Sequence, residues 1–474
     1  YRLVMQDSIV VEENRVYITQ QHQEEEDTAS MIARKLHERI PVLTIEKELE
    51  EAQEDLNITL SEQQKEAVRM VFANPISIIT GGPGTGKTTV LKIILYIYQK
   101  KCGNEVKLMA PTGRAARRMA ESTGSGDATT MHMALGLFGD GDYEALIDEL
   151  SADFINVDEV SMVDMHLAYE FFYKVKAGAR VLLVGDVHQL PSVGAGDVFR
   201  QLILCGKIPV TVLNLVYRQG KDSNIPINAQ LINEGKTNLQ WGDDFQMVEC
   251  SGADAAAQIV KNIYLKEIQM YGMEQVQILS PYKVRSAAGV LELNRSLQDE
   301  VNPPVSGKRE LHLGGEIFRE GDRILQNKNT EFASNGDLGT LVQIAEDEDN
   351  NPLVQIVFTD GRRVKYEAEQ VEMIEHANAI TIHKSQGSEC QVVIIPWLKA
   401  FYPMLKRNIF YTGITRAKQR VYIVGEWKAV CQAIHTDDTG TRKTMLAVKI
   451  QQYCERYQRQ ENRRIPATIC NRAV

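Results

Sequence analysis

A lysine and a threonine follow a run of glycines between Gly81 and Thr88. The run fits G-x-x-x-x-G-K-[ST] and lies between a β-branched apolar stretch and a helical pattern that extends to about Gln99. Glycines let successive backbone N–H groups curve around an anion, and the helix directs its positive end toward the same group. We therefore expect a nucleotide-phosphate loop formed by Gly82, Pro83, Gly84, Thr85, Gly86, Lys87, Thr88 and Thr89.

Within this loop, Lys87 is expected to reach the β- and γ-phosphates, and Thr88 to be a ligand of Mg²⁺. Further along the chain, the segment DFINVDEVSMVD places Asp158 and Glu159 at the end of an apolar run. Asp158 can hold Mg²⁺ through water, and Glu159 can orient and deprotonate an attacking water. Gln189 follows another buried strand, at the sheet edge where ligands bind, and it is expected to sense the γ-phosphate. A carboxylate that can activate water, placed beside a metal-binding aspartate, favours ATP hydrolysis over phosphoryl transfer to a small acceptor.

These residues must be positioned by strands and helices that alternate from about 52 to 216, a pattern that predicts a parallel sheet with flanking helices. A second such lobe is expected at 217–300 and 375–440. The segments RVLLVGD and RVYIVGE, one in each lobe, share a pattern and support duplication. Between the two parts of the second lobe, residues 301–374 change to short runs separated by Asn-Gly, Asp-Gly and acidic turns, which predict a small antiparallel barrel.

Eight segments resemble, in order and over residues 60–426, the motifs of superfamily 1B helicases of the RecD-like branch. They read GGPGTGKT, APTGRAARRMAESTG, TTMHMALG, VDEVSMVD, GDVHQLPSVGAGDVF, YRQ, AITIHKSQGSE and YTGITRAKQRVYIVGE. The resemblance implies an α/β fold of two RecA-like lobes with the nucleotide between them and an SH3-like insert in the second lobe. It also implies ATP-driven 5′→3′ movement on single-stranded DNA.

Further site residues follow from the same resemblance. Gln64 is expected to read the adenine edge, and Arg218 and Arg416 to reach the γ-phosphate from the far lobe. Gly387 and Glu389 are expected to link the nucleotide to the DNA track. The two arginines also make physical sense, because a guanidinium is always charged and can fork onto phosphate oxygens.

Single-strand binding that tolerates any sequence needs phosphate partners and stacking faces. The expected DNA contacts are Thr112, Arg114, His132, Lys283, Thr381, His383 and Lys384. The segment RAARR that holds Arg114 has the alternative role of a solvated helix face, and His132 that of a satisfied core histidine. Residues 136–150 include the run Gly-Asp-Gly-Asp, which could turn a short hairpin. Relatives use such a hairpin to split the duplex; here a plain surface loop is the alternative, because the segment is short and acidic.

The composition sets limits on these interpretations. The chain has 474 residues, 43% hydrophobic and 24% charged, an ordinary soluble profile for two to four domains, and no apolar run reaches the ~18 residues of a membrane span. Seven scattered cysteines without a C-x-x-C pair are typical of a reducing compartment, so we expect a cytoplasmic protein. Because the net charge is −10, DNA must bind in a local groove. Residues 1–51 read as the end of an N-terminal region cut from something longer, and 441–474 as a helical tail with a basic end.

The leading hypothesis is therefore an ATP- and Mg²⁺-dependent 5′→3′ DNA helicase or translocase that acts on single-stranded DNA and on single-strand/duplex junctions. A DNA-stimulated translocase that remodels forks or protein–DNA complexes without efficient unwinding is the alternative. A DNA-binding scaffold that does not hydrolyse ATP is disfavoured by Glu159, Arg218 and Arg416. A small-molecule P-loop kinase should lack the far-lobe arginines.

Overall fold

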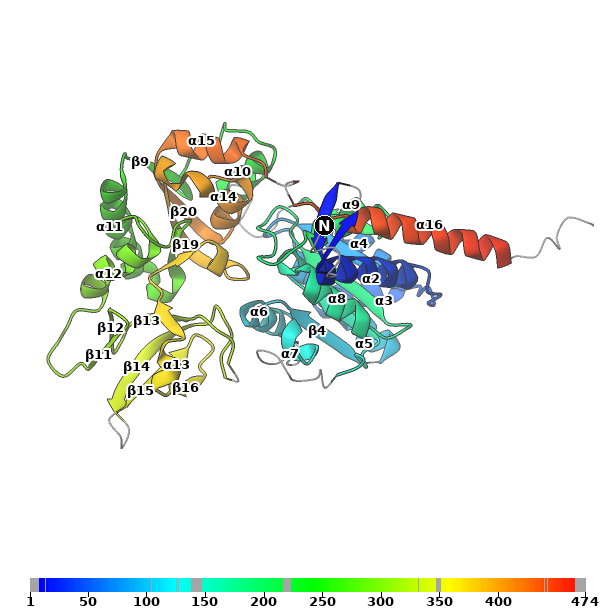
Figure 1. Cartoon of the computed structure of the whole chain (residues 1–474), viewed down its shortest axis with the longest axis horizontal. Coiled ribbons are helices and arrows are strands. Elements are labelled where there is room, and N and C mark those ends of the chain that lie inside the picture. The colour runs from blue at the N-terminus through cyan, green and yellow to red at the C-terminus, as the bar shows by residue number, and fades with distance from the viewer. Residues whose placement is uncertain are drawn as a thin grey trace, which may run out of the picture.

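The computed structural model describes residues 8–12, 14–103, 105–124, 126, 128–137, 147–215, 223–330, 332–346, 351–438, 440 and 442–464. Figure 1 shows two bodies side by side: one formed by the N-terminal part of the chain and the last helix, the other by the middle and later parts. The expected γ-phosphate arginine Arg218 and residues 138–146 of the expected hairpin lie outside the described residues.

The first lobe is a six-stranded, wholly parallel sheet with strand order β5-β4-β6-β7-β3-β8. Every residue of β3, β6 and β7 is buried, as expected where helices cover both faces of a parallel sheet. The strands are β3 (Ile76–Gly81), β4 (Val106–Ala110), β5 (Ala128–Thr130), β6 (Phe154–Val157), β7 (Arg180–Gly185) and β8 (Val210–Leu213). The helices are α4 (Glu62–Ala73), α5 (Lys87–Cys102), α6 (Gly113–Thr123), α7 (Met131–Ala134), η1 (Val160–Met162), α8 (Met165–Lys174) and α9 (Val198–Leu204).

Alternate residues of these strands face two separate apolar cores. Ile78 and Leu183 pack in the core under α8 and α9, whereas their neighbours Ile79 and Leu182 pack in the core under α4, α5 and α6. The sheet therefore holds the carboxyl ends of β3, β6 and β7 rigidly, and the glycine loop and the two carboxylates follow these ends.

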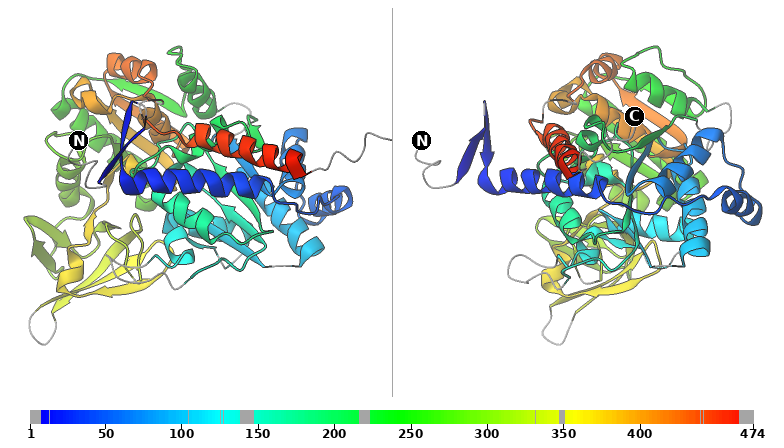
Figure 2. Two further views of the ribbon diagram at one scale, coloured as in Figure 1. Left: turned by 45° about the vertical axis from the view of Figure 1, so that its right-hand side comes forward. Right: turned by 90° about the vertical axis from the view of Figure 1, so that its right-hand side faces the viewer.

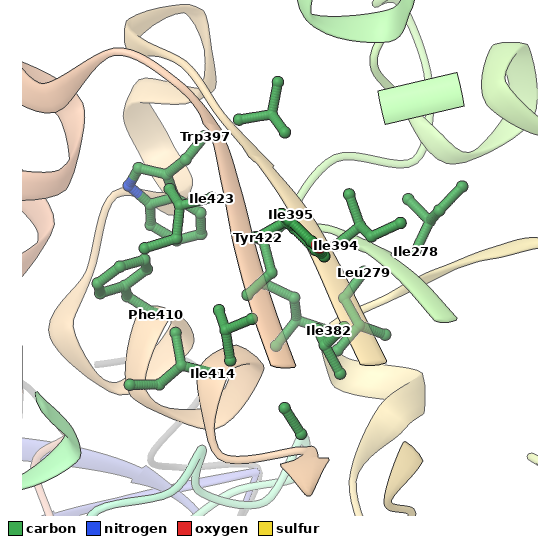
Figure 3. Close-up of a cluster of buried hydrophobic side chains, with 14 of the residues drawn as sticks. Ile278, Leu279, Ile382, Ile394, Ile395, Trp397, Phe410, Ile414, Tyr422 and Ile423 are labelled. Carbon is green, nitrogen blue, oxygen red and sulfur yellow. The ribbon is translucent and has the colours of Figure 1, made fainter. Parts of the chain in front are cut away.

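The second lobe is a five-stranded parallel sheet with strand order β18-β10-β19-β20-β9. Its core includes Trp397, whose ring lies 4.9 Å from that of Phe410, and the isoleucines of β19 and β20 (Figure 3). The strands are β9 (Phe245–Glu249), β10 (Val276–Ser280), β18 (Ala379–Thr381), β19 (Cys390–Trp397) and β20 (Ala417–Gly425). The helices are α10 (Asn224–Asn233), α11 (Ala253–Tyr271), η2 (Met273–Gln275), α12 (Val290–Val301), η3 (His383–Ser385), η4 (Lys399–Met404), α14 (Arg407–Ile414) and α15 (Trp427–His435). The two parallel sheets confirm the expected α/β class.

An antiparallel insert interrupts the second lobe. Its sheet has strand order β16-β15-β14-β13-β17 around a small apolar core of its own, and a separate hairpin, β11-β12, precedes it. Gln326 of β13 is paired with Ile374 of β17, so the insert leaves and re-enters the lobe on neighbouring strands. The elements are β11 (Glu310–Leu313), β12 (Glu316–Arg319), β13 (Arg323–Gln326), β14 (Leu338–Glu346), β15 (Pro352–Phe358), β16 (Arg363–Tyr366), α13 (Ala368–Val371) and β17 (Ile374–His376).

Both ends of the described chain pack on the first lobe. The last helix, α16 (Leu446–Arg464), lies alongside α2 (Thr19–Leu36), as Figure 2 shows, and buried Lys449 forms ion pairs with Glu26 at 2.8 Å and with Glu12 and Glu25 at 3.4 Å. The remaining N-terminal elements are β1 (Ile9–Glu12), β2 (Arg15–Ile18) and α3 (Glu46–Asp55). In the part of the chain that the structure describes, no helix is both long and apolar enough to cross a bilayer.

Candidate active site between the two lobes

The glycine loop connects β3 to α5 with two residues in left-handed conformation, Gly84 (φ 76°) and Gly86 (φ 85°). A side chain is strained at such φ values, so both positions favour glycine. The Lys87 ammonium lies back over the loop and donates to the carbonyl of Gly81 at 2.5 Å and to that of Gly82 at 2.9 Å. A cation is therefore already present where a phosphate would enter, and it is held by weak neutral acceptors that an anion can replace.

Gln64 is tied to this loop. Its amide nitrogen donates to the Thr85 carbonyl at 3.3 Å, and its amide oxygen accepts from the Ser61 backbone N–H at 3.0 Å in the capping box that begins α4. The expected adenine contact thus lies beside the phosphate loop, with both amide atoms engaged in protein hydrogen bonds. The other expected phosphate contacts are half-buried on the loop and the first turn of α5: Pro83, Thr88 and Thr89.

The expected carboxylates Asp158 and Glu159 are buried at the carboxyl end of β6, and the Glu159 N–H donates to Asp158 Oδ1 at 2.8 Å. Burial and the neighbouring charge of Glu159 raise the pKa of Asp158, while Lys87 and Arg118 oppose this rise. Glu159 has φ 53° and ψ 40°, a conformation that costs a non-glycine residue about 1–3 kcal/mol. The fold therefore holds two acidic groups together close to the Lys87 ammonium.

Arg118, on α6, joins this group although the sequence analysis did not select it. One guanidinium nitrogen lies 3.1 Å from Glu159 Oε1, and another lies 3.0 Å from Glu389 Oε1 in the second lobe. Burial alone would lower the pKa of Arg118, but the charges of Glu389, Glu159 and Asp158 raise it above its ordinary value. Helical spacing was the available signal, because Arg118 lies four residues after Arg114 and so on the same face of α6.

Tyr411 of α14 reaches the glycine loop from the second lobe. It is a second site residue that the sequence analysis did not select. Its hydroxyl donates to buried Asp186 at 2.8 Å, and a Cβ built on Gly82 would lie 3.2 Å from the hydroxyl oxygen. Burial and Asp186 raise the pKa of Tyr411 well above its ordinary value, while the positive charge of Arg416 acts in the opposite direction. The second lobe therefore brings a tyrosine and an arginine to the phosphate loop.

Arg416 and Gln189 both carry buried polar atoms without partners. Arg416 is 3% exposed; it donates to the Ser388 carbonyl at 3.3 Å, but its Nε finds no acceptor and its guanidinium no carboxylate among the described residues. Gln189 donates to Asp186 at 3.3 Å, and its amide oxygen is left without a donor in the same part of the chain. Such atoms are costly to bury, so they fit a site built to take up a polar ligand: the Arg416 N–H fits an anion, and the Gln189 oxygen fits a donor such as water.

The expected DNA contacts fall into two groups. On the first lobe, Thr112 caps α6 and accepts from the Ala115 N–H at 3.3 Å, while His132 is exposed on α7. Arg114 points toward the second lobe, where burial lowers the pKa of its guanidinium to about 10 and where its Nη1 has no partner among the described residues. Gly387 (φ 72°) packs against the Thr112 side chain, so it links this group to the second lobe.

On the second lobe, Lys283 and Lys384 share one acidic partner. Their ammonium groups lie 2.5 Å and 3.0 Å from the two oxygens of Glu375, on strand β17 of the insert. Burial would raise the pKa of Glu375, but the two lysines lower it. Thr381 and His383 lie beside Lys384, and burial together with the charge of Lys406 lowers the pKa of His383. A phosphate that binds these lysines would therefore compete with the Glu375 carboxylate for their ammonium groups.

Comparisons with protein families match three parts of the chain. A model described as an AAA domain matches residues 59–253, and one for the UvrD-like helicase C-terminal domain matches 376–424. A model for the SH3 domain of ATP-dependent RecD-like DNA helicases matches 293–358, which covers most of the antiparallel insert. The matches follow the order of the two lobes and the insert.

The chain is also similar to individual proteins. The ATP-dependent RecD2 DNA helicase of Deinococcus radiodurans is 35% identical over 370 residues, which cover 78% of this chain and 50% of that protein. The RecD subunit of the RecBCD enzyme of Haemophilus influenzae is 27% identical, covering 81% of this chain and 72% of that one. A solved structure of Pif1 helicases at forked duplex DNA is 19% identical, covers 78% of this chain and 92% of that one, and has a TM-score of 0.49. The chain thus spans half the length of the Deinococcus relative, and over its two lobes and the insert it is similar to RecD-like DNA helicases of superfamily 1B.

Proposed function

We propose that the chain hydrolyses ATP between its two lobes and uses the cycle to move 5′→3′ along single-stranded DNA, opening duplex at junctions. The observation that carries this proposal is the position of Arg416. It is a buried guanidinium of the second lobe without a carboxylate partner in the described chain, and its charge acts on Tyr411, whose hydroxyl lies at Gly82 of the first lobe. A motor needs such a cation on the opposite lobe, because hydrolysis then removes a bond between lobes.

In this proposal the first lobe supplies most of the nucleotide contacts. Lys87 leaves the loop carbonyls for the β- and γ-phosphates. Thr88 and Asp158 are the residues that would hold Mg²⁺, which would supply positive charge to the phosphates. Glu159 accepts a proton from the attacking water, and Gln189 turns its amide N–H groups toward the γ-phosphate. The second lobe adds Arg416 and, at the position matched by the family motif, Arg218.

The DNA track is proposed to cross both lobes beside the insert. Thr112 and Arg114 supply the first-lobe contacts, and His132 extends them on α7. Thr381, His383 and Lys384 supply the second-lobe contacts together with Lys283. Since Glu375 already pairs with both lysines, its negative charge opposes a phosphate there, and the net attraction is smaller than that of two lysines without an acidic partner.

ATPase assays with and without oligo(dT) test the proposal. We expect single-stranded DNA to raise the turnover number, and we expect a duplex with a 5′ single-stranded tail to be unwound in preference to one with a 3′ tail. ATPase that ignores DNA would contradict the proposal. Stimulated ATPase without strand separation on either substrate would instead assign the chain to translocation without unwinding.

The Glu159→Gln variant should bind ATP and DNA together but hydrolyse ATP at least about a hundredfold more slowly than wild type. The change keeps the shape of the side chain and removes the base. The measurement is single-turnover hydrolysis alongside DNA affinity with ATP present. A tight, long-lived DNA complex is the expected signature. Glu62→Gln is the matched control and should behave as wild type. Glu62 lies on α4, and its side chain is 81% exposed. Wild-type turnover in Glu159→Gln would assign water activation to another residue.

A further inference from the structure

Helix α6 contacts the second lobe and the insert as well as its own lobe. At its N-terminus, a Cβ built on Gly387 would lie 3.1 Å from Thr112 Oγ1, so the second lobe packs directly on the cap of this helix. One turn later, Arg117 forms ion pairs with Asp337 and Asp360 of the insert. A displacement of the second lobe or of the insert must therefore either move α6 or break its contacts with them.

Arg118, the next residue, carries this contact to the catalytic carboxylate. Its two terminal nitrogens hold Glu159 in the first lobe and Glu389 in the second, at 3.1 and 3.0 Å. The side chains of Glu159 and Glu389 are only 7% and 10% exposed, so both carboxylates are shielded from water, while the Arg118 side chain is 32% exposed. Because a guanidinium is planar and rigid, one carboxylate cannot move relative to the other without breaking a hydrogen bond or turning Glu159.

We infer that Arg118 is a positioning residue that makes hydrolysis depend on DNA, by holding the Glu159 carboxylate against Glu389 until DNA binding moves α6 or the second lobe. The inference rests on the proposed function, in which Glu159 is the base and Thr112 borders the DNA track. While Glu159 Oε1 accepts from Arg118, that oxygen is engaged and less available to take a proton from water. When DNA binding separates the Glu159 and Glu389 carboxylates, the hydrogen bond from Arg118 breaks and this oxygen of Glu159 becomes free.

The first test is the ATPase rate of Arg118→Gln with and without saturating oligo(dT). We expect the DNA-free rate to rise at least about fivefold and the DNA-saturated rate to stay near that of wild type, so that the stimulation ratio falls by at least about fivefold, the lower end of usual coupling between sites. Arg69→Gln is the matched control, since Arg69 is a first-lobe arginine paired with exposed Glu46 on the surface. Its stimulation ratio should equal that of wild type.

A second variant keeps the test decisive if Arg118→Gln folds poorly. Glu389→Gln leaves the contact between Arg118 and Glu159 but weakens the link to the second lobe, so its stimulation ratio should fall as well. If both act through one bridge, the double variant should be no worse than Arg118→Gln alone, whereas independent effects would multiply. Multiplying effects, an unchanged ratio in Glu389→Gln, or a DNA-free rate of Arg118→Gln that does not rise would overturn the inference. If wild-type ATPase itself ignores DNA, the proposed function fails; if only the variants keep the wild-type ratio, the function stands and this inference alone is overturned.

Discussion

Replacing Lys87 by alanine is expected to lower ATP hydrolysis by at least about 10³-fold while the fold survives. One lost donor to a developing anion typically costs about 10²–10³ in turnover, and Lys87 is assigned to two phosphates. The fold should survive because Lys87 is half-buried, and among the described residues its ammonium donates hydrogen bonds to the Gly81 and Gly82 carbonyls only. Two such hydrogen bonds contribute about 1–3 kcal/mol, less than the usual stability of a domain.

The measurement is steady-state ATPase at saturating DNA, with the thermal melting temperature recorded beside it. Lys100→Ala is the matched control, because Lys100 lies on the last turn of the same helix, is solvent-exposed and pairs with Glu51 on α3. A Lys87→Ala enzyme that hydrolyses ATP near the wild-type rate would show that the glycine loop does not hold the reacting phosphates. Loss of activity together with a collapse of the melting temperature would instead assign Lys87 to the stability of the loop.

The parts of the site that depend on local sequence could be predicted, and those created by contact between lobes could not. The loop from Gly81 to Thr88 needs only a strand, left-handed glycines and a helix N-terminus, all of which are visible in neighbouring residues. Asp158 and Glu159 follow a buried strand and are equally local. Tyr411 is different, because it lies on a buried apolar face of α14 and becomes a site residue only when the second lobe packs against Gly82.

The partners of charged side chains also could not be predicted from the sequence. The motif positions of Lys283 and Lys384 predict phosphate contacts, but no spacing in the sequence indicates that Glu375 pairs with both. The same holds for Arg118, whose two partners are 41 and 271 residues away along the chain. Periodicity identifies which face of a helix a residue occupies, but the partner that meets this face depends on the packing of lobes and insert.

Arg416→Ala is expected to lower turnover by about 10³–10⁵-fold with little change in ATP affinity, the range observed for arginines that stabilise phosphoryl transfer. The first lobe holds the phosphates through the glycine loop and Lys87, so most binding energy remains without Arg416. The arginine acts from the second lobe on charge that develops as the γ-phosphate leaves. Turnover and nucleotide affinity, measured separately by single-turnover kinetics and by equilibrium binding, should therefore change by very different factors.

Arg416→Lys separates charge from geometry. A lysine keeps the positive charge but lacks the planar fork, so it should recover part of the turnover lost in the alanine variant and not all of it. Because Arg416 is buried, the alanine variant also leaves a cavity beside Ser388, and its melting temperature must be recorded with that of the lysine variant. Arg459→Ala, on the exposed face of α16 with a side chain 76% exposed, is the arginine control and should keep wild-type turnover. Equal losses of affinity and turnover in Arg416→Ala would place Arg416 in nucleotide binding rather than in the chemical step, and wild-type turnover would remove it from the site.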